Sequence, residues 1–548
     1  MKKQLKVLCS LLLVLTIAFS LVACGSSEEE IWDDDKKPSQ SNKDKDKDKT
    51  ENPDKDGDSN SQPTDDKTYR IRTVEDLLAL PKQLEKHVLD AEVVVLLEND
   101  LTVNDTSDFS TWTTSEDKRA SLINWTPIKY FSGTFDGQGH TISGLYCCVD
   151  QSEDQYISAA FLYNLYPGAT LENLNIADSL FYSAERRTTT VLTATNRGTV
   201  QNCHIRAEAY SNAMYISLLA GSTREGGQII DCTVAGRATH IGSGIQVYVG
   251  GICSSLDGDC AIQNCVNYAE LRGEHGAHIG GIVASAQGKV TGCANYGFID
   301  NAGNDTGGIA ASLSEESTAA MTYCVNYGKI SNCRESGGVT AGIVARLGSG
   351  SVRYCENRGD IYAADDAGGV CGVVREEGVL SDCLNLGAVR STLDTTTFEI
   401  LLGGIVGENL GRVERCCNAA GVDSVHTAGG IAGDIAGNNA IVTQCWNFGE
   451  SIGQKYAAGI VGGNHLSEGS ITQCHNYGVS QAEQTFDFCD TRQGIAPIDC
   501  YSLQSDGYEQ RITVSNFDFS TVWHLPESNK KYPTLRNLPT HPETSPLG

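Results

Sequence analysis

Basic residues are scarce in this chain. Its 548 residues include 41 lysines and arginines against 69 aspartates and glutamates, which gives a formal net charge of −28. Such a polyanion repels the phosphates of nucleic acids and the headgroups of acidic lipids. The composition therefore argues against a nucleic-acid partner and against direct adsorption to an anionic bilayer, and it suits a soluble surface protein.

Two motifs that would indicate a metal are also missing. The chain has no His-Glu-x-x-His sequence, the zinc-binding signature of many metallopeptidases. Its repeating phrase contains no Cys-x-x-Cys pair of the kind that structural zinc sites use. We therefore expect no metal and no other cofactor. Proline is rare too, at 12 residues against 58 glycines, which indicates that glycine makes many tight turns.

The N-terminus resembles a bacterial lipoprotein signal. Three lysines precede an apolar run over residues 8–21, which is too short for a membrane-spanning helix of the mature protein. The run ends in Leu-Val-Ala-Cys at Cys24, followed by Gly-Ser. In lipoproteins with this lipobox the peptide is cut before the cysteine, which then carries the acyl chains. The resemblance implies a signal peptide over 1–23, lipid attachment at Cys24, and an extracytoplasmic protein whose membrane partner is reached through that lipid.

Residues 24–68 form a separate, strongly charged segment. It has almost no apolar side chains, and lysine alternates with aspartate over residues 43–48. A segment of this composition cannot bury enough surface to offset its ordering entropy. We expect a disordered acidic tether between the lipid and a folded body.

The body is built from an internal repeat. Cysteines recur at intervals of 28–33 residues, and eight of the ten open the phrase Cys-x-Asn. A second phrase, Gly-Gly-Ile or a close variant, falls in each of the eight intervals between Cys232 and Cys474. Self-similarity at this period is typical of a solenoid. The ten cysteines are Cys203, Cys232, Cys265, Cys293, Cys324, Cys355, Cys383, Cys416, Cys445 and Cys474.

The local period inside the phrase is two. Cys293 is followed at even steps by Asn295, Gly297 and Ile299, and a period of two indicates a strand with these residues on one face. No useful helical stretch separates the repeats. Short strands with glycine-rich corners, about three per repeat, predict an all-β fold: a right-handed parallel β-helix in which each coil packs only on its neighbours.

Both ends of this β-helix are expected to be capped. A capping-box sequence at Thr73 predicts a short helix to about His87, followed by a strand over 92–97. Aromatic residues over 517–535 are expected to plug the last coil. The predicted organisation is an N-terminal cap and first coil over 69–145, repeats over 146–500, and a C-terminal cap and tail over 501–548.

The cysteines and asparagines of the phrase are expected to face the interior. Cysteine behaves as a small buried residue, and stacked asparagine amides satisfy bent backbone groups. Removal of the signal and lipidation of Cys24 leave an odd 19 cysteines, which does not look like a disulfide framework, although disulfides between coils stay open. The predicted structural ladder comprises Cys265, Cys293, Cys324, Cys355, Cys383, Cys416, Cys445, Cys474, Asn295, Asn326 and Asn357.

The body resembles the GLUG-repeat, pectin-lyase-like β-helix proteins of bacterial surfaces. The resemblance rests on residues 131–145, on Gly-Gly-Ile-Val-Gly at 403–407, on Ala-Gly-Ile-Val-Gly at 458–462 and on the Trp…Tyr-Pro-x-Leu ending. It covers about residues 69–538 and implies a β-helix and a location outside the cell. The same repeats accompany IgA-specific metallopeptidases and large adhesins, but the missing zinc signature means that the peptidase activity does not carry over.

One outward pattern is a candidate binding site. The third position after the repeat cysteine is an odd step and should point outward if the even steps point inward. Several of these positions are aromatic, and a flat aromatic row can bind sugar rings or a protein. The alternative is a stacking ladder that only stabilises the sheet. The candidate stripe comprises Tyr268, Tyr296, Tyr327, Phe448 and Tyr477.

Catalytic motifs are weak. Asp365-Asp366 is the one Asp-Asp pair of the later coils, and a solvated turn is the simpler interpretation. His140 lacks the second glycine of the Gly-His-Gly motif found in polygalacturonase-like β-helices, and His275 and His278 have no carboxylate at ligand spacing. We assign no catalytic residue, and an enzyme is the less favoured interpretation.

The sequence thus predicts a lipid-anchored surface β-helix that binds or adheres to a polysaccharide or a surface protein. Two other functions stay open. One is a polysaccharide lyase or hydrolase with an unrecognised site, and the other is a structural scaffold of the cell envelope.

Overall fold

The computed structural model describes residues 67–149, 158–184, 188–242, 246–314, 319–333, 337–394, 398–436, 439–463, 469–490, 496–502, 517–526 and 531–548. The chain divides into two units, Met1–Thr64 and Asp65–Gly548, and all described residues belong to the second. Cys24 and the signal peptide lie outside the described residues. In the part of the chain that is described, no helix is both long and apolar enough to span a membrane.

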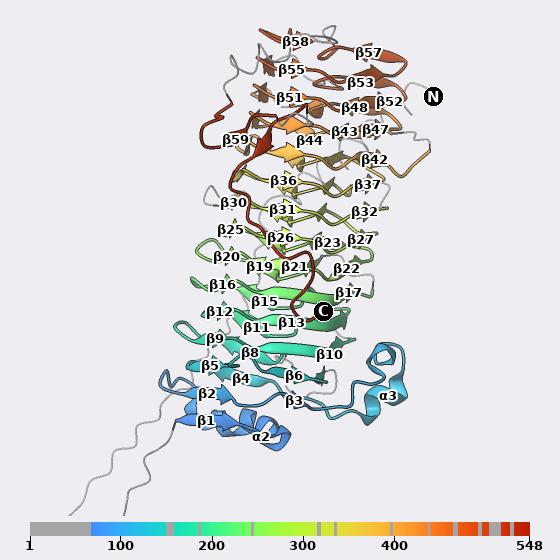
Figure 1. Cartoon of the computed structure of the whole chain (residues 1–548). Helices are drawn as coiled ribbons and strands as arrows, with labels where there is room; N and C mark the ends of the chain where they lie inside the picture. Colours follow the sequence, from blue (N-terminus) through green and yellow to red (C-terminus); the bar gives the residue numbers. More distant parts are fainter. Residues whose placement is uncertain are drawn as a thin grey trace, which may run out of the picture. The chain divides into compact units, whose positions relative to one another are not determined.

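The second unit is a parallel β-solenoid, as the repeat predicted (Figure 1). A typical coil carries five short strands, and each pairs in parallel with its counterpart one coil away. The prediction of a right-handed, all-β parallel β-helix is confirmed. The strands of this coil are β25 (Lys289–Thr291), β26 (Ala294–Asn295), β27 (Ile299–Asn301), β28 (Thr306–Gly307) and β29 (Ala310–Leu313).

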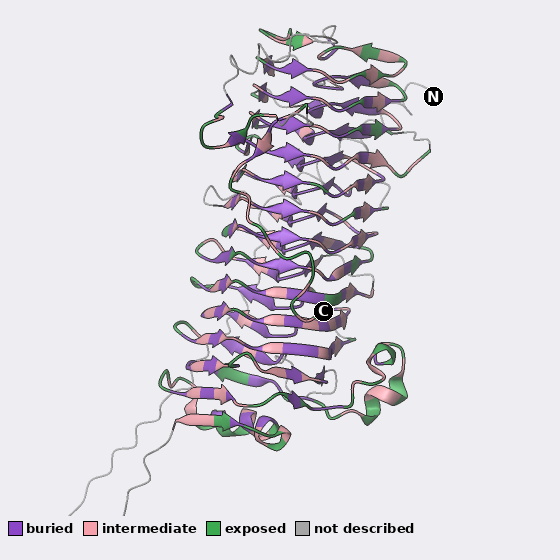
Figure 2. Ribbon diagram, in the orientation of Figure 1, coloured by how far each residue is buried: buried purple, intermediate pink, exposed green. Residues whose placement is uncertain are grey.

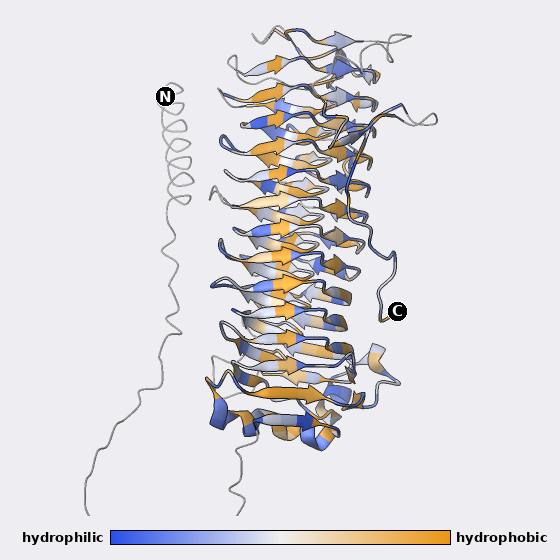
Figure 3. Cartoon of the chain, turned by 60° about the vertical axis from the view of Figure 1, so that its left-hand side comes forward, coloured by the Kyte–Doolittle hydropathy of each residue, from blue (hydrophilic) through white to orange (hydrophobic). Residues whose placement is uncertain are grey.

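Within the described ranges, four sheets run along the solenoid axis. The described part of sheet A has 14 strands, from β1 (Thr68–Ile71) to β54 (Ser470–Thr472). Sheet C has 11, from β4 (Ile128–Phe131) to β49 (Ala432–Ile435), and sheet D has 10, from β14 (Tyr215–Ser217) to β57 (Gln484–Phe486). Sheet B holds the strands that follow each repeat cysteine. Aliphatic side chains from all sheets fill one continuous core, so that burial and hydropathy repeat from coil to coil (Figures 2 and 3).

The asparagine of the repeat decides the shape of sheet B. Where the second position after the cysteine is Ile205 or Val234, the strand runs unbroken as β13 (His204–Ser211) or β17 (Thr233–His240). Where it is asparagine, two short strands replace the long one. The first strands of these bent coils are β21 (Val266–Asn267), β26, β31 (Val325–Asn326), β36 (Glu356–Asn357), β41 (Leu384–Asn385), β46 (Cys417–Asn418), β51 (Trp446–Asn447) and β55 (His475–Asn476). The second strands are β22 (Glu270–Gly273), β27, β32 (Ile330–Asn332), β37 (Ile361–Ala363), β42 (Val389–Ser391), β47 (Val422–Ser424), β52 (Ser451–Gly453) and β56 (Ser480–Gln481).

These asparagines form a buried hydrogen-bonded ladder. The Nδ2 of Asn326 donates to Oδ1 of Asn357 at 2.9 Å, and Asn357 donates in turn to Asn385 at 2.8 Å. Each Nδ2 also donates to the carbonyl two residues ahead, as Asn326 does to Gly328. The side chain thus satisfies main-chain groups at the bend, and this is why asparagine breaks the strand without leaving buried polar groups unpaired.

The N-terminal end carries the predicted helical cap. Helix α2 (Val74–Leu84) continues into a 3-10 turn, η1 (Glu85–His87). The side chains of Thr73 and Asp76 each accept a hydrogen bond from the other's backbone N–H, which is the capping box expected from sequence. Leu77, Leu80 and Leu84 are buried against the first coils.

A second excursion covers the side of the first coils. It contains η2 (Phe109–Thr111) and α3 (Glu116–Ser121). Trp112 from this excursion is fully buried against Tyr146 and Leu180, which face outward from sheet B.

The aromatic C-terminal residues lie elsewhere than predicted. They form an antiparallel pair, β59 (Trp523–His524) with β60 (Thr534–Leu535), which packs on the side of the solenoid and not over its last coil. The physical reason is an apolar outer surface on sheet B at Leu384, Cys417 and Trp446, against which Phe517, Trp523 and Leu535 are buried. From there the chain descends along the outside of the stack (Figure 1).

Candidate functional site

The repeat cysteines fill the interior of the solenoid. The side chains of Cys265, Cys293 and Cys324 are fully buried, and the cysteines from Cys147 to Cys500 carry free thiols. The Sγ of Cys324 donates to the carbonyl of Thr322 at 3.4 Å, across a left-handed residue, Tyr323 (φ 56°). Burial raises the pKa of the Cys265 and Cys293 thiols, which keeps them protonated. Within the described residues no group of His, Cys, Asp or Glu is arranged to hold a metal ion.

The predicted aromatic stripe lies on the outer face of sheet B in two separate stacks. Tyr268 and Tyr296 have ring centroids 5.3 Å apart, and those of Tyr296 and Tyr327 are 4.4 Å apart with nearly parallel planes. Phe448 and Tyr477 stack at 4.8 Å further along the axis. These spacings follow from one ring per coil, because neighbouring strands lie about 4.8 Å apart.

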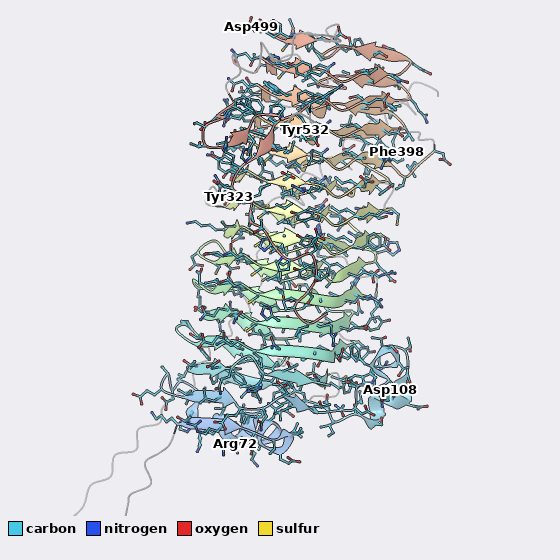
Figure 4. All side chains as sticks on the ribbon, viewed as in Figure 1. Arg72, Asp108, Tyr323, Phe398, Asp499 and Tyr532 are labelled. Atoms are coloured by element: carbon cyan, nitrogen blue, oxygen red, sulfur yellow. The ribbon has the colours of Figure 1, made fainter. Side chains whose placement is uncertain are left out.

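The chain's own C-terminal residues cover much of this stripe. The Tyr268 hydroxyl donates to the carbonyl of Pro542 at 2.5 Å, and the Tyr296 hydroxyl donates to that of His541 at 3.4 Å. In the other stack, the ring centroid of Phe448 lies 6.4 Å from that of Tyr532, which belongs to the C-terminal segment (Figure 4). Both stacks of the stripe therefore contact the C-terminal segment of the same chain.

Beside the stripe lies a cluster of cations over aromatic rings. The Arg358 guanidinium lies 5.3 Å from the ring centroid of Tyr327. The ring of Tyr362 has the Lys329 ammonium at 4.4 Å and the Arg390 guanidinium at 5.8 Å. We call these five residues the cation–aromatic cluster. Its three cations come from three successive coils, so that they step along the outer face of sheet B.

The cations differ in how far they are neutralised. Arg358 pairs with the buried Glu356, and Arg390 pairs with Asp360 at 3.2 Å. Lys329 is exposed and makes no ion pair within the described residues. Contact with an aromatic ring holds a cation in place without removing its charge. Lys329 therefore supplies the cluster's uncompensated positive charge on a protein that is otherwise strongly acidic.

The Asp365-Asp366 pair is not the solvated turn expected from sequence. Asp365 Oδ2 accepts a hydrogen bond from the backbone N–H of Gly337 at 2.5 Å, and Asp366 Oδ1 accepts one from Leu401 at 2.8 Å. Both carboxylates are partly buried, and each ties the corner to a neighbouring coil. The turn is ordered because these backbone donors come from adjacent coils, which lie far away in the sequence.

Asp366 belongs to a larger group of carboxylates. Burial, together with the charges of Asp365, Glu408 and Glu399, raises the pKa of Asp366 to about 7. Glu408 in β44 (Val406–Asn409) is the register partner of Asp434 in β49, one coil further along. A carboxylic acid that titrates near neutrality beside other carboxylates is a feature of acid–base sites.

The histidines from the sequence analysis have different surroundings. His275 is exposed. His278, in β23 (Ala277–Gly280), has its Nδ1 3.3 Å from Asp305, so the expectation that it lacks a carboxylate partner is wrong. Asp305 lies on the next coil and also pairs with Arg346 at 2.8 Å. His140 lies 3.2 Å from Asp100 on a surface corner.

Sequence reasoning missed Lys329, Tyr362 and Arg390, as well as Glu408 and Asp434. The position of each residue within its repeat can be read from the sequence, but no one residue type is kept at that position through the other repeats. A signal was available in a weaker form: Lys329 and Arg390 stand five and seven positions after the repeat cysteines Cys324 and Cys383, and both steps point outward when the cysteine points inward.

Comparison with known proteins gives a similar solved structure but no related sequence. No protein-family model matches the chain, and no curated protein matches it. A solved structure described as a "putative immunoglobulin A1 protease" from Bacteroides ovatus is similar, with 15% sequence identity and a TM-score of 0.34 over 64% of this chain and 85% of that chain.

Proposed function

We propose that this protein is a lipid-anchored, extracytoplasmic binding protein whose β-solenoid recognises an anionic polysaccharide through the cation–aromatic cluster. The observation that carries the proposal is the placement of Lys329, Arg358 and Arg390 on three successive coils, each beside a tyrosine ring. A polymer lying along the axis meets one cation per coil, of which Lys329 makes no ion pair within the described residues and the two arginines pair with Glu356 and Asp360. Carboxylate or sulfate groups on its sugars are the matching chemistry.

The rigid coil supports this function. Because each strand is hydrogen bonded to the coils above and below, the cations keep fixed separations, and a preorganised site loses little entropy when a ligand binds. The acidic remainder of the protein repels polyanions, so binding is confined to the cluster.

The test uses the soluble unit Asp65–Gly548 and a panel of acidic and neutral polysaccharides. The triple change Lys329→Ala, Arg358→Ala and Arg390→Ala should abolish binding to acidic polymers. The matched control removes three exposed cations from sheet A, by Lys289→Ala, Arg353→Ala and Arg412→Ala, with the same change in net charge. If the two triple variants lose binding equally, the attraction depends only on net charge, and the cation–aromatic cluster is not the binding site.

Membrane attachment has its own test. The lipobox ending at Cys24 and the acidic tether that follows support an anchor at the cell surface. In the native host or a related bacterium, the wild-type protein should partition with membranes and incorporate labelled fatty acid. Cys24→Ala should do neither. A membrane-bound Cys24→Ala protein would rule out anchoring through this cysteine.

A second candidate function is favoured by the carboxylates around Asp366. A glycosidase needs one carboxyl group that is protonated near neutral pH and a second that is ionised, and Asp366 with a pKa of about 7 fits the first role beside Glu408. Release of reducing ends by the wild-type protein, lost in Asp366→Asn and in Glu408→Gln, would establish an enzyme. Binding without release in the same assay supports the binding protein.

A further inference from the structure

The last ten residues are held differently from the rest of the C-terminal segment. The stretch through Leu538 contributes Phe517, Trp523 and Leu535 to a buried apolar cluster. Residues 539–548 contribute no buried side chain, and residues 538–542 belong to no helix or strand. They nevertheless follow the outer face of sheet B closely (Figure 1).

Contact with this last stretch runs mainly through its main-chain carbonyls. Tyr296 donates to the carbonyl of His541, and Tyr268 donates to the carbonyl of the next residue, Pro542. Further along, the Arg206 guanidinium donates to the carbonyl of Leu547 at 2.8 Å. The three donors follow repeat cysteines on the same outer face of sheet B. The face therefore contacts this stretch mainly through its carbonyls, and the chain turns between Ser545 and Gly548, where the Gly548 N–H donates to the Ser545 carbonyl at 3.0 Å.

One side chain of the stretch also takes part. The His541 Nε2 lies 2.9 Å from the carbonyl of Gly292 and donates to it. Gly292 is in the left-handed region (φ 67°) at the corner before Cys293. Most other coils place a non-glycine residue at this corner, as Tyr323 does (Figure 4). The imidazole therefore stands at a corner that carries no side chain of its own.

The sequence of the stretch fits this mode of contact. Pro539, Pro542 and Pro546 are three of the chain's 12 prolines, and they fall within its last ten residues. Proline has no N–H, so these three positions offer only a carbonyl acceptor to a face whose side chains donate. Pro539 and Pro542 are three residues apart, the repeat of a polyproline II helix, and aromatic-lined faces recognise such helices.

We propose that Tyr268, Tyr296 and Arg206 form a binding site for proline-containing peptides, and that residues 539–547 of the same chain are its resident ligand. The site shares no residue with the cation–aromatic cluster, although Tyr296 stacks on Tyr327 of that cluster, and it does not depend on polysaccharide binding. It takes a peptide of the same chemistry in trans whenever its own segment is displaced.

The test measures binding of a labelled peptide with the sequence of residues 536–548. Two hosts have the site vacated: the full chain with Pro539→Gly, Pro542→Gly and Pro546→Gly, and a chain that ends at Leu538, which loses no buried residue. The peptide should bind both hosts at least about tenfold more tightly than it binds the wild-type chain, because the tethered segment no longer competes. A peptide with the three prolines replaced by glycine should not bind.

The residues of the binding site are tested by the double substitution Tyr268→Phe and Tyr296→Phe, made in both hosts. Phenylalanine keeps the stacked rings and removes only the two donors, so the fold is retained and the peptide affinity should return to the wild-type level. Unchanged affinity after these two substitutions would overturn the assignment. Failure of the peptide to bind the chain ending at Leu538, with its melting temperature equal to that of the wild type, would also overturn it.

Discussion

Gly342 and Asn357 meet inside the solenoid: a Cβ on Gly342 would lie 2.2 Å from the Asn357 Cγ and 2.2 Å from the Gly369 carbonyl oxygen. The same approach recurs along the stack, for example between Gly308 and Asn326. The second glycine of one repeated phrase is therefore required by the asparagine of the other. The two phrases are one packing unit.

Gly342→Ala should destabilise the protein by about 2–3 kcal/mol, because the asparagine ladder must shift to admit a methyl group. Chemical denaturation measures this change. Gly421→Ala is the matched control, since a Cβ there meets only the Glu450 carbonyl at 3.9 Å. Equal stability of the two variants would mean that the ladder tolerates displacement.

Cys324→Asp should abolish cooperative folding near neutral pH. The Cys324 side chain is fully buried among aliphatic residues, and an aspartate there places an unpaired carboxylate in the core. Cys324→Ala removes only a small group and should fold. Thermal unfolding of both, with the exposed Cys333→Asp as control, checks the expectation. A Cys324→Asp protein that melts like the wild type would contradict an inward-facing cysteine.

The period of two and the phrase spacing predicted the solenoid because each coil repeats the same local chemistry. Cys293, Asn295 and Gly297 indicate a strand, a bend and a close approach within five residues. The N-terminal cap was predictable for the same reason, since the capping box of α2 lies within four residues. Features that neighbouring residues encode can therefore be predicted from the sequence alone.

Contacts between coils were not predictable in this way. Asp305 reaches His278, 27 residues earlier, and Arg346, 41 residues later, and neither interval marks a motif. Asp366 resembled a solvated pair because its backbone donor, Leu401, lies on the next coil. The C-terminal segment is the extreme case, since Tyr296 and His541 are 245 residues apart.

Asp366→Asn should change how stability depends on pH. The pKa of Asp366 is raised to about 7 in the folded protein, chiefly by burial, against about 4 in an unfolded chain. The unfolded state ionises first, so this group lowers stability progressively as pH rises from about 4 to about 7. Asparagine keeps an acceptor for the Leu401 N–H and removes the titration.

The variant should therefore match the wild type in melting temperature near pH 4 and exceed it near pH 8. Asp423→Asn, at an exposed position of β47, controls for the loss of one negative charge. If Asp366→Asn and Asp423→Asn shift the pH profile alike, the neighbouring carboxylates Asp365, Glu399 and Glu408 do not act on Asp366 as inferred.

Trp446→Ala should release the C-terminal segment while leaving the solenoid intact. Trp446 points outward from β51, one position after the inward-facing Cys445, and its ring centroid lies 4.7 Å from that of Phe517. Truncating a buried tryptophan costs about 3–5 kcal/mol. Here that loss falls on docking of the segment, because the ring contributes nothing to the interior core.

Limited trypsin digestion followed by mass spectrometry separates the two effects. Wild-type protein should resist cleavage after Arg536, whose side chain donates to the carbonyls of Trp523 and Phe519. Trp446→Ala should be cut there rapidly, with an unchanged melting transition of the coils. Trp112→Ala, which removes an equally buried tryptophan from the excursion that covers the first coils, should leave Arg536 protected. Protection of Arg536 in both variants would show that the segment is held by its polar contacts alone, since Tyr268, Tyr296 and Arg206 would then suffice without the apolar anchor.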